Sequence, residues 1–487
     1  MAEDKDILKS SIIQGFGTLI VREFFLKLLS FVGQIFLARL LFPSDFGIYV
    51  IITFIIGFFG LFSDIGLSLA IIQKKAEPTK AELSAIFILK LLLSLGLILL
   101  IWILAPYARL FYTTFNDANV MMLRVFSITL LLASLRAVPI SLLERKIKYN
   151  LISMLDIIGV FVFYVTALLG AVLGLGVWSF IAGAVIKEIL ETVILYIVQP
   201  FLPQLTFSWK SIKKMIKFGV YIQGNGLVNF LRSSVVPVIG GRINGPHAVG
   251  LLDFAFNIAL IPETVASNFG RVAFAGYSRI QSQRELLASS ISRSMSMLSI
   301  MLYIFPVIIF SFGSVLIPLI FSEKWAPALP ALYWYSAGAF FLPVIASLGQ
   351  GILAIGKSKE IFWGSFLTAV SGWVIAFLLV STYGFVAIAA TYFLTSFFFS
   401  VFYIIVLKRS GLEINIISVF KPKIAAVALS LVFSFGLNIL LPQGFFPIII
   451  KLFLSAVSYF IFMLIFAKKD TQELFSLIIY WINPKRI

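Results

Sequence analysis

Long apolar runs fill the chain from about residue 11 to residue 467, and the gaps between them alternate between basic and nearly charge-free. Together with the span ends beside them, the even-numbered gaps and the two termini hold 25 Lys and Arg residues, whereas the odd-numbered gaps hold only four. Loops that stay in the cytoplasm retain Lys and Arg, and translocated loops lack them. The alternation therefore predicts a chain that crosses a membrane repeatedly and has both termini in the cytoplasm.

The runs are continuously apolar and lack the two-residue alternation of a β-barrel, so the sequence predicts an all-α integral membrane protein. A membrane-spanning helix needs roughly 20 apolar residues. Fourteen segments meet this requirement: about 11–37, 44–72, 82–104, 119–141, 152–173, 177–198, 212–240, 246–276, 286–312, 328–354, 358–381, 385–407, 422–441 and 445–467.

The net charge of +17 would suggest nucleic-acid binding in a soluble protein. Here most of the excess lies in predicted cytoplasmic loops, where membrane orientation and anionic lipid headgroups explain it, so we expect no nucleic-acid partner. The chain has no Cys and one His, His247. Disulfides, thiol chemistry and a His-based metal site are therefore excluded, and no gap is long enough for a soluble catalytic domain.

The gap at 199–211 carries two prolines and divides the chain near its middle. We expect an amino-terminal lobe of six spans (1–200), a second lobe of six (201–409), and a third part (410–487) with two spans and an amphipathic cytoplasmic tail. Matched features support a repeat: Gly47 and Gly250 are 203 residues apart, and Pro139 and Pro343 are 204 apart. Six spans per repeat make the two halves parallel, and transporters often place the substrate path between such halves.

Charged and polar residues inside the spans indicate where chemistry occurs, because a charge at mid-bilayer costs roughly 2.5–3.5 kcal/mol. The eighth span carries a polar stripe at helical spacing, and Pro262 predicts a kink midway along it. The stripe consists of Asp253, Asn257, Thr264, Ser267 and Arg271, with Asn268 beside it. We interpret the stripe as the wall of a wet cavity; the alternative is a polar seam that packs against a neighbouring helix.

Three other spans carry charges of interest. The seventh carries Asn225, Asn229 and Arg232, and the sixth contains a plausible Lys187–Glu191 pair. In the first span Glu23 and Lys27 are spaced to neutralise one another, whereas Arg22 lacks such a partner. Four basic residues without a close partner predict an electropositive cavity suited to a phosphate-bearing substrate: Arg22, Lys90, Arg232 and Arg271.

Three segments resemble polysaccharide flippases of the multidrug/oligosaccharidyl-lipid/polysaccharide superfamily, in the branch of O-antigen and exopolysaccharide translocases. The residues Leu37–Gln73 (LARLLFPSDFG…FSDIGLSLAIIQ) resemble the signature of that branch. The residues Asn244–Gln281 are similar to its region of spans 7 and 8, and Leu353–Lys359 (LAIGKSK) to its loop between spans 10 and 11.

The resemblance implies two six-helix lobes around a central cavity, two further carboxy-terminal helices, and rocking between inward-open and outward-open states. It implies a substrate oligosaccharide on undecaprenyl pyrophosphate, moved to the outer leaflet of a bacterial cytoplasmic membrane, with a polysaccharide polymerase and glycosyltransferases as partners besides membrane lipids. Arg22, Arg232 and Arg271 would hold the pyrophosphate. The other cavity candidates are Asn229, Asp253, Asn257 and Asn268.

The resemblance also implies that a proton or sodium gradient drives transport, with Glu23, Asp64 and Glu263 as candidate coupling residues and no other cofactor. Two alternatives stay open. A drug/cation antiporter of the same superfamily needs acidic residues to hold cations, and the unpaired charges here are mainly basic. A membrane-embedded polymerase or glycosyltransferase usually carries a large outer loop or a cytoplasmic domain, and neither is evident in the sequence. We therefore expect a transporter with no catalytic or metal site.

Overall fold

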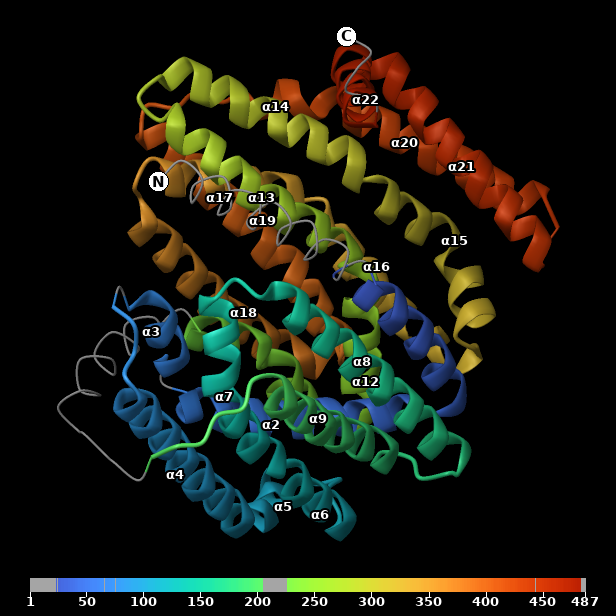
Figure 1. Ribbon diagram of the computed structural model, residues 1–487. Coiled ribbons are helices and arrows are strands. Elements are labelled where there is room, and N and C mark those ends of the chain that lie inside the picture. Colours follow the sequence, from blue (N-terminus) through green and yellow to red (C-terminus); the bar gives the residue numbers. More distant parts are fainter. Residues whose placement is uncertain are drawn as a thin grey trace. The chain divides into compact units, whose positions relative to one another are not determined.

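The computed structural model describes residues 23–482, except for 24, 65, 75, 205–225 and 443. The described residues are helical throughout, with short turns and no strand, as the sequence predicts (Figure 1). The chain divides into two compact units, unit 1 (Met1–Gly250) and unit 2 (Leu251–Ile487). This boundary lies within a helix, whereas the predicted division at residue 200 lies in a loop.

Unit 1 is a bundle of helices around a core of aliphatic and aromatic side chains that includes Ile51, Ile52 and Val249. Residues 25–40 and 226–233 are helical, and a single π-helical turn, Val236–Gly240, follows the second of these segments. The other helices are α2 (Pro43–Asp64), α3 (Leu67–Gln73), α4 (Lys80–Leu104), α5 (Ala108–Phe111), α6 (Asp117–Phe126), α7 (Ile128–Arg145), α8 (Tyr149–Val172), α9 (Trp178–Val198) and α11 (Gly241–Ile243).

Unit 2 begins within α12 (Gly245–Ala259) and contains the remaining helices. These are α13 (Ile261–Arg279), α14 (Arg284–Leu302), α15 (Ile304–Ile320), α16 (Leu329–Ala339), α17 (Leu342–Ala354), α18 (Ser358–Tyr383), α19 (Val386–Arg409), α20 (Ile416–Leu440), α21 (Phe445–Phe466) and α22 (Lys468–Ile482). The tail predicted to be a short helix is therefore α22, which packs against α14 and α21.

Local sequence accounts for the ends and bends of these helices. Thr79 and Glu82 form a capping box at the start of α4, each side chain bonding the backbone N–H of the other. Pro262 is the second residue of α13, and the chain bends there by 50°, which confirms the predicted kink. Pro237 lies in the π-helical turn, where its missing N–H removes one bond from the helical ladder.

By length and composition, nine described helices are apolar enough to cross a membrane, or up to eleven if each bent pair counts as one span. The predicted total of fourteen is thus not confirmed. The first half of two predicted spans, 11–37 and 212–240, falls outside the described residues. The predicted span 177–198 corresponds to α9, which is not among the nine. This helix is 21 residues long but carries Lys187, Glu188 and Glu191 in its middle.

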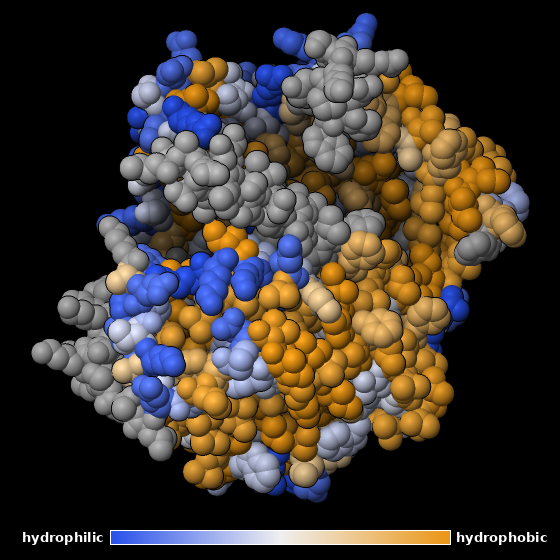
Figure 2. Space-filling model, viewed as in Figure 1, coloured by the Kyte–Doolittle hydropathy of each residue, from blue (hydrophilic) through white to orange (hydrophobic). Residues whose placement is uncertain are grey.

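Apolar side chains cover much of the face seen in Figure 2. Many large hydrophobic residues are exposed along the helices, for example Leu99 at 63%, Phe377 at 66% and Phe453 at 67%. Such exposure would be unfavourable in water and is what a lipid-facing surface requires. The structure is therefore that of a multi-pass membrane protein.

Candidate functional site

The polar stripe of the eighth predicted span lies on α12 and α13, on both sides of the bend. On α12, Asp253 is half-buried and accepts a 3.0 Å hydrogen bond from the exposed amide of Asn257. This bond lies within one helix and engages one of the two carboxylate oxygens. The two residues form a polar pair on one face of α12, as their four-residue spacing predicts.

In the first half of α13 the exposed polar residues are Glu263, Ser267, Asn268 and Arg271, while Thr264 is half-buried. The Arg271 guanidinium donates to the Asn268 side-chain oxygen one turn earlier. Among the residues that the structure describes, no acid lies within ion-pair distance of Arg271. The guanidinium therefore keeps most of its donors for other groups, as the sequence predicts.

The other predicted substrate-binding residues are only partly described. Asn229 and Arg232 are both exposed on the helical segment 226–233, and no ion pair to a described residue engages Arg232. Arg22 and Asn225 lie outside the described residues. Glu23 is half-buried and makes an interaction with the rest of the chain.

The prediction that Lys90 has no close partner is wrong. The Lys90 ammonium lies 2.5 Å from an Asp64 carboxylate oxygen and donates to the Ser68 hydroxyl at 2.9 Å. Lys90 is on α4 and Asp64 ends α2, so 26 residues separate the partners and helical spacing could not reveal the pair. Asp64, a candidate coupling residue, is therefore already neutralised by a basic side chain.

A second charged cluster in unit 1 was not predicted as a whole. Arg136 of α7 donates to Glu188 through one terminal nitrogen and to Glu191 through the other, both on α9. The Lys187 ammonium lies 3.8 Å from the Glu191 carboxylate, which confirms the predicted pair. The exposed fractions of Arg136, Glu188 and Glu191 are 12%, 19% and 8%, so the cluster is largely buried. The sequence does carry a signal for this cluster: one predicted span contains the basic residue Arg136, and another contains the two acids Glu188 and Glu191.

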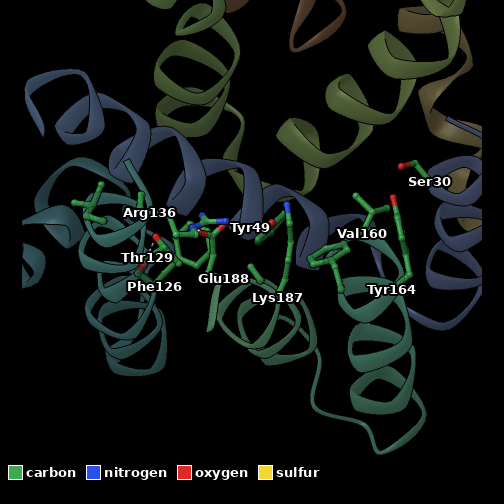
Figure 3. A pocket seen from close by; sticks show the side chains of 13 residues that line it. Ser30, Tyr49, Phe126, Thr129, Arg136, Val160, Tyr164, Lys187 and Glu188 are labelled. Carbon is green, nitrogen blue, oxygen red and sulfur yellow. Dashed lines mark hydrogen bonds and ion pairs between the residues drawn. The ribbon is translucent and has the colours of Figure 1, made fainter. Parts of the chain in front are cut away.

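The cluster borders a cavity of about 410 Å³ inside unit 1. Figure 3 shows Arg136 and Glu188 turned towards each other, with Lys187 reaching into the cavity beside them. Polar atoms of Ser30, Tyr49, Thr129 and Tyr164 also line it, among rings and aliphatic side chains from α6, α7, α8 and α9. The cavity thus combines a charged wall with an apolar one.

The described acidic residues bear on cation binding. Asp64, Glu188 and Glu191 each engage a basic side chain, and no group of three His, Cys, Asp or Glu side chains in the described part of the chain could hold a metal ion. Exposed guanidinium groups without acid partners, by contrast, bind phosphate oxygens in bidentate geometry. The exposed Arg232 and Arg271 are therefore suited to an anionic group, while Glu263 and Asp253 on α13 and α12 have no basic partner among the described residues.

The family described as "Polysaccharide biosynthesis protein" matches residues 36–330. The succinoglycan biosynthesis transport protein ExoT of Rhizobium meliloti (strain 1021) is 24% identical over 345 residues, 70% of this chain and 69% of that protein. The lipopolysaccharide biosynthesis protein WzxC of Escherichia coli (strain K12) is 22% identical over 308 residues, 62% of each chain.

Two solved structures resemble the fold. The lipid II flippase MurJ, in an inward closed conformation, aligns with a TM-score of 0.74 at 16% identity, over 92% of this chain and 98% of that one. An inward-facing multidrug resistance transporter of the MATE family aligns with a TM-score of 0.61 at 13% identity, over 80% and 95%. At these identities the likeness concerns the fold alone.

Proposed function

The chain belongs to the polysaccharide biosynthesis protein family, and from this membership we propose that it flips a polyprenyl-pyrophosphate-linked oligosaccharide across a membrane. The membrane is the bacterial cytoplasmic one, the movement is from the cytoplasmic to the outer leaflet, and both termini are cytoplasmic. Support comes from the relatives named for succinoglycan and lipopolysaccharide biosynthesis and from the alternation of basic loops along the sequence.

The observation that carries the proposal is the exposed Arg271 guanidinium on α13, whose described partner is only the amide oxygen of Asn268. A guanidinium within a membrane-spanning helix is costly unless water, an acid or a ligand compensates its charge. A pyrophosphate carries at least two negative charges and accepts paired hydrogen bonds from the planar guanidinium. Arg271 is therefore the proposed headgroup ligand in unit 2.

The remaining parts of the proposal concern energy and partners. A proton or sodium gradient supplies the energy for the uphill direction, and the flipped glycan passes to a polysaccharide polymerase after glycosyltransferases have assembled it. The chain acts as a transporter rather than an enzyme. The antiporter alternative draws support from the MATE-like fold, but the described acids Asp64, Glu188 and Glu191 are engaged by basic side chains instead of being open to a cationic drug.

Binding of undecaprenyl pyrophosphate to the purified protein tests the proposal. We expect Arg271→Ala to raise the dissociation constant about tenfold or more, since a hydrogen bond to a charged group contributes about 1.5–3 kcal/mol. Arg271→Lys keeps the charge without the planar fork and should lie between the two. The matched control is Arg279→Ala, an exposed arginine two turns further along α13, which should bind like the wild type.

Binding of uncharged undecaprenol should be equal in all four proteins, because it lacks the group that Arg271 holds. Unchanged affinity of Arg271→Ala for the pyrophosphate would contradict the proposed role. A stronger affinity of the wild type for an organic cation than for the pyrophosphate would favour the antiporter instead.

A further inference from the structure

The cluster of Arg136, Glu188 and Glu191 contains one oxygen that ion pairing does not satisfy. One Glu191 carboxylate oxygen accepts from Arg136, but the other, Oε1, is buried and has no hydrogen-bond donor among the described residues. It lies against Gly159 of α8, so closely that a Cβ on Gly159 would fall 1.8 Å from it. A buried acceptor without a donor is destabilising, and more so when it is charged.

The charges of the cluster also leave the Glu191 carboxylate incompletely compensated. One guanidinium compensates one carboxylate, so the second depends on Lys187. That ammonium is 3.8 Å from Glu191 Oε1, beyond hydrogen-bond distance, and its side chain is 30% exposed and lines the cavity. When two carboxylates share one site, the second is readily neutralised by taking up a proton. Either the Lys187 ammonium or a proton can therefore balance the second carboxylate of this cluster.

A cavity lies beside the cluster, lined by Arg136, Lys187 and Glu188 but not by Glu191 itself. Its volume of about 410 Å³ has room for on the order of ten water molecules. Glu191 is one turn further along α9 than Lys187 and Glu188, and it is joined to the cavity wall through its bond from Arg136. A sodium ion fits less well, because it needs several oxygen ligands and Arg136 already occupies one oxygen of each acid.

We propose that Glu191 is a proton-binding site of unit 1, loaded and unloaded through the cavity, with Lys187 as the counter-charge that replaces the proton. On loading, a hydronium ion in the cavity breaks one of its O–H bonds and becomes water, an O–H bond forms on Glu191, and Lys187 turns into the cavity. On unloading, the O–H bond breaks, the proton returns to cavity water, and the ammonium moves back towards the carboxylate. Because the freed ammonium would attract an anion, the site couples proton binding to the transport proposed above, and this coupling rests on that proposed function.

The charged groups that face Glu191 are Arg136 from α7 and Lys187 and Glu188 from its own helix. On α8, Asp156 lies one turn before Gly159 and makes an interaction of its own with the chain. The experiment therefore changes Glu191 and Lys187 separately and leaves the other groups in place.

Infrared difference spectra of the purified protein, acidic minus alkaline and without substrate, report protonated carboxylic acids through their C=O stretching band. Glu191→Gln should remove a buried component of that band, whereas Glu263→Gln, an exposed acid on α13, should retain it. Lys187→Met removes the competing charge, so the band should persist to a pH higher by about one unit or more, a tenfold change in proton affinity.

An unchanged band in Glu191→Gln would overturn the proposal. If that variant does not fold, Lys187→Met decides alone, and a band with the same pH midpoint as the wild type would overturn it. These spectra involve no lipid, so their outcome is independent of the Arg271 binding experiment. If Arg271→Ala binds the pyrophosphate as tightly as the wild type does, while the infrared band still depends on Glu191, only the proposed function is contradicted.

Discussion

Gly47 of α2 and Gly250 of α12 pack against one another's helices at backbone contact. A Cβ on Gly47 would fall 1.7 Å from the carbonyl oxygen of Pro246, and one on Gly250 would fall 1.8 Å from the carbonyl oxygen of Pro43. The two contacts are reciprocal, and each glycine follows a proline by four residues. The residues that the sequence pairs at an offset of 203 thus meet in space.

This close approach predicts a specific sensitivity to alanine. In Gly47→Ala the added methyl group cannot fit beside a backbone oxygen, so α2 and α12 must separate, and overpacking of this kind costs about 1–3 kcal/mol. The melting temperature in detergent should fall. The control is Gly57→Ala on the same helix, where the nearest atom would be 3.7 Å away, an ordinary contact, and helix propensity favours alanine. Equal melting of both variants would refute the contact.

The Lys90–Asp64 pair predicts an asymmetric pattern of destabilisation. The Lys90 side chain is 6% exposed and that of Asp64 is 38% exposed. Asp64→Asn therefore leaves a buried ammonium without its ion-pair partner and should lower the free energy of unfolding by about 3 kcal/mol. Lys90→Met leaves an acid that is still partly exposed, so it should lower the free energy of unfolding by less. The double variant should recover most of the loss in a thermal melt. Additive effects of the two changes would show that the residues do not interact.

The carboxy-terminal helix α22 is held to unit 2 by Asp470, which accepts from Lys423 of α20 at 2.6 Å and from Ser296 of α14 at 2.5 Å. Burial works to raise the pKa of Asp470, but the hydrogen bonds from Lys423 and Ser296 and the charge of Lys423 outweigh it and lower the pKa below its ordinary value. A lowered folded-state pKa gives stability that is present above the unfolded pKa and lost as pH falls through the folded one.

Asp470→Asn should therefore loosen α22 at neutral pH, and the wild type should loosen only in acid below about pH 4. The expected cost is about 1 kcal/mol, less than for a fully buried pair, because the Asp470 side chain is 36% exposed. Trypsin cleavage at the exposed Lys468 and Lys469 measures the release. Lys423→Met combined with Asp470→Asn should restore resistance to trypsin. If Asp470→Asn is cleaved at neutral pH at the same rate as the wild type, Asp470 does not hold α22 in place.

The polar stripe predicts which positions meet water in this chain without cysteine. Single Asn257→Cys and Ser267→Cys variants place a thiol at exposed positions and should react with a small charged thiol reagent. Leu260→Cys and Ala266→Cys place it where the exposed fractions are 7% and 3%, and should react at least about tenfold more slowly. Equal rates at all four positions would remove the argument for a wet face.

Local patterns were sufficient to predict the features that lie within one helix. The bend at Pro262, the Lys187–Glu191 pair and the helical tail after Lys468 all follow from spacing or from proline chemistry. The partners of Lys90 and Arg136 could not be predicted in this way, because 26 residues separate Lys90 from Asp64 and 52 separate Arg136 from Glu188. Which helix faces which is decided by tertiary packing, and a single sequence carries no direct record of it.

The coupling candidates illustrate the same limit. Glu23, Asp64 and Glu263 stand out in the sequence because each is an acid in an apolar run. Only the structure shows that Asp64 is neutralised by Lys90 and that Glu263 is exposed, whereas Glu191 combines burial with an oxygen that lacks a donor among the described residues. Chemical type can be read from the sequence, but the environment that gives a carboxylate its role cannot.

The most direct test of the account is transport by the purified protein in lipid vesicles. A polyprenyl-pyrophosphate oligosaccharide, enclosed in the inner leaflet, becomes accessible to a glycosidase added outside only after it has been flipped. We predict rapid digestion with the wild type and the Arg279→Ala control, and digestion slowed about tenfold or more with Arg271→Ala, in line with the loss of a charged hydrogen bond. Wild-type vesicles that protect the inner glycan as well as protein-free vesicles do, or Arg271→Ala vesicles that match the wild type, would contradict the account.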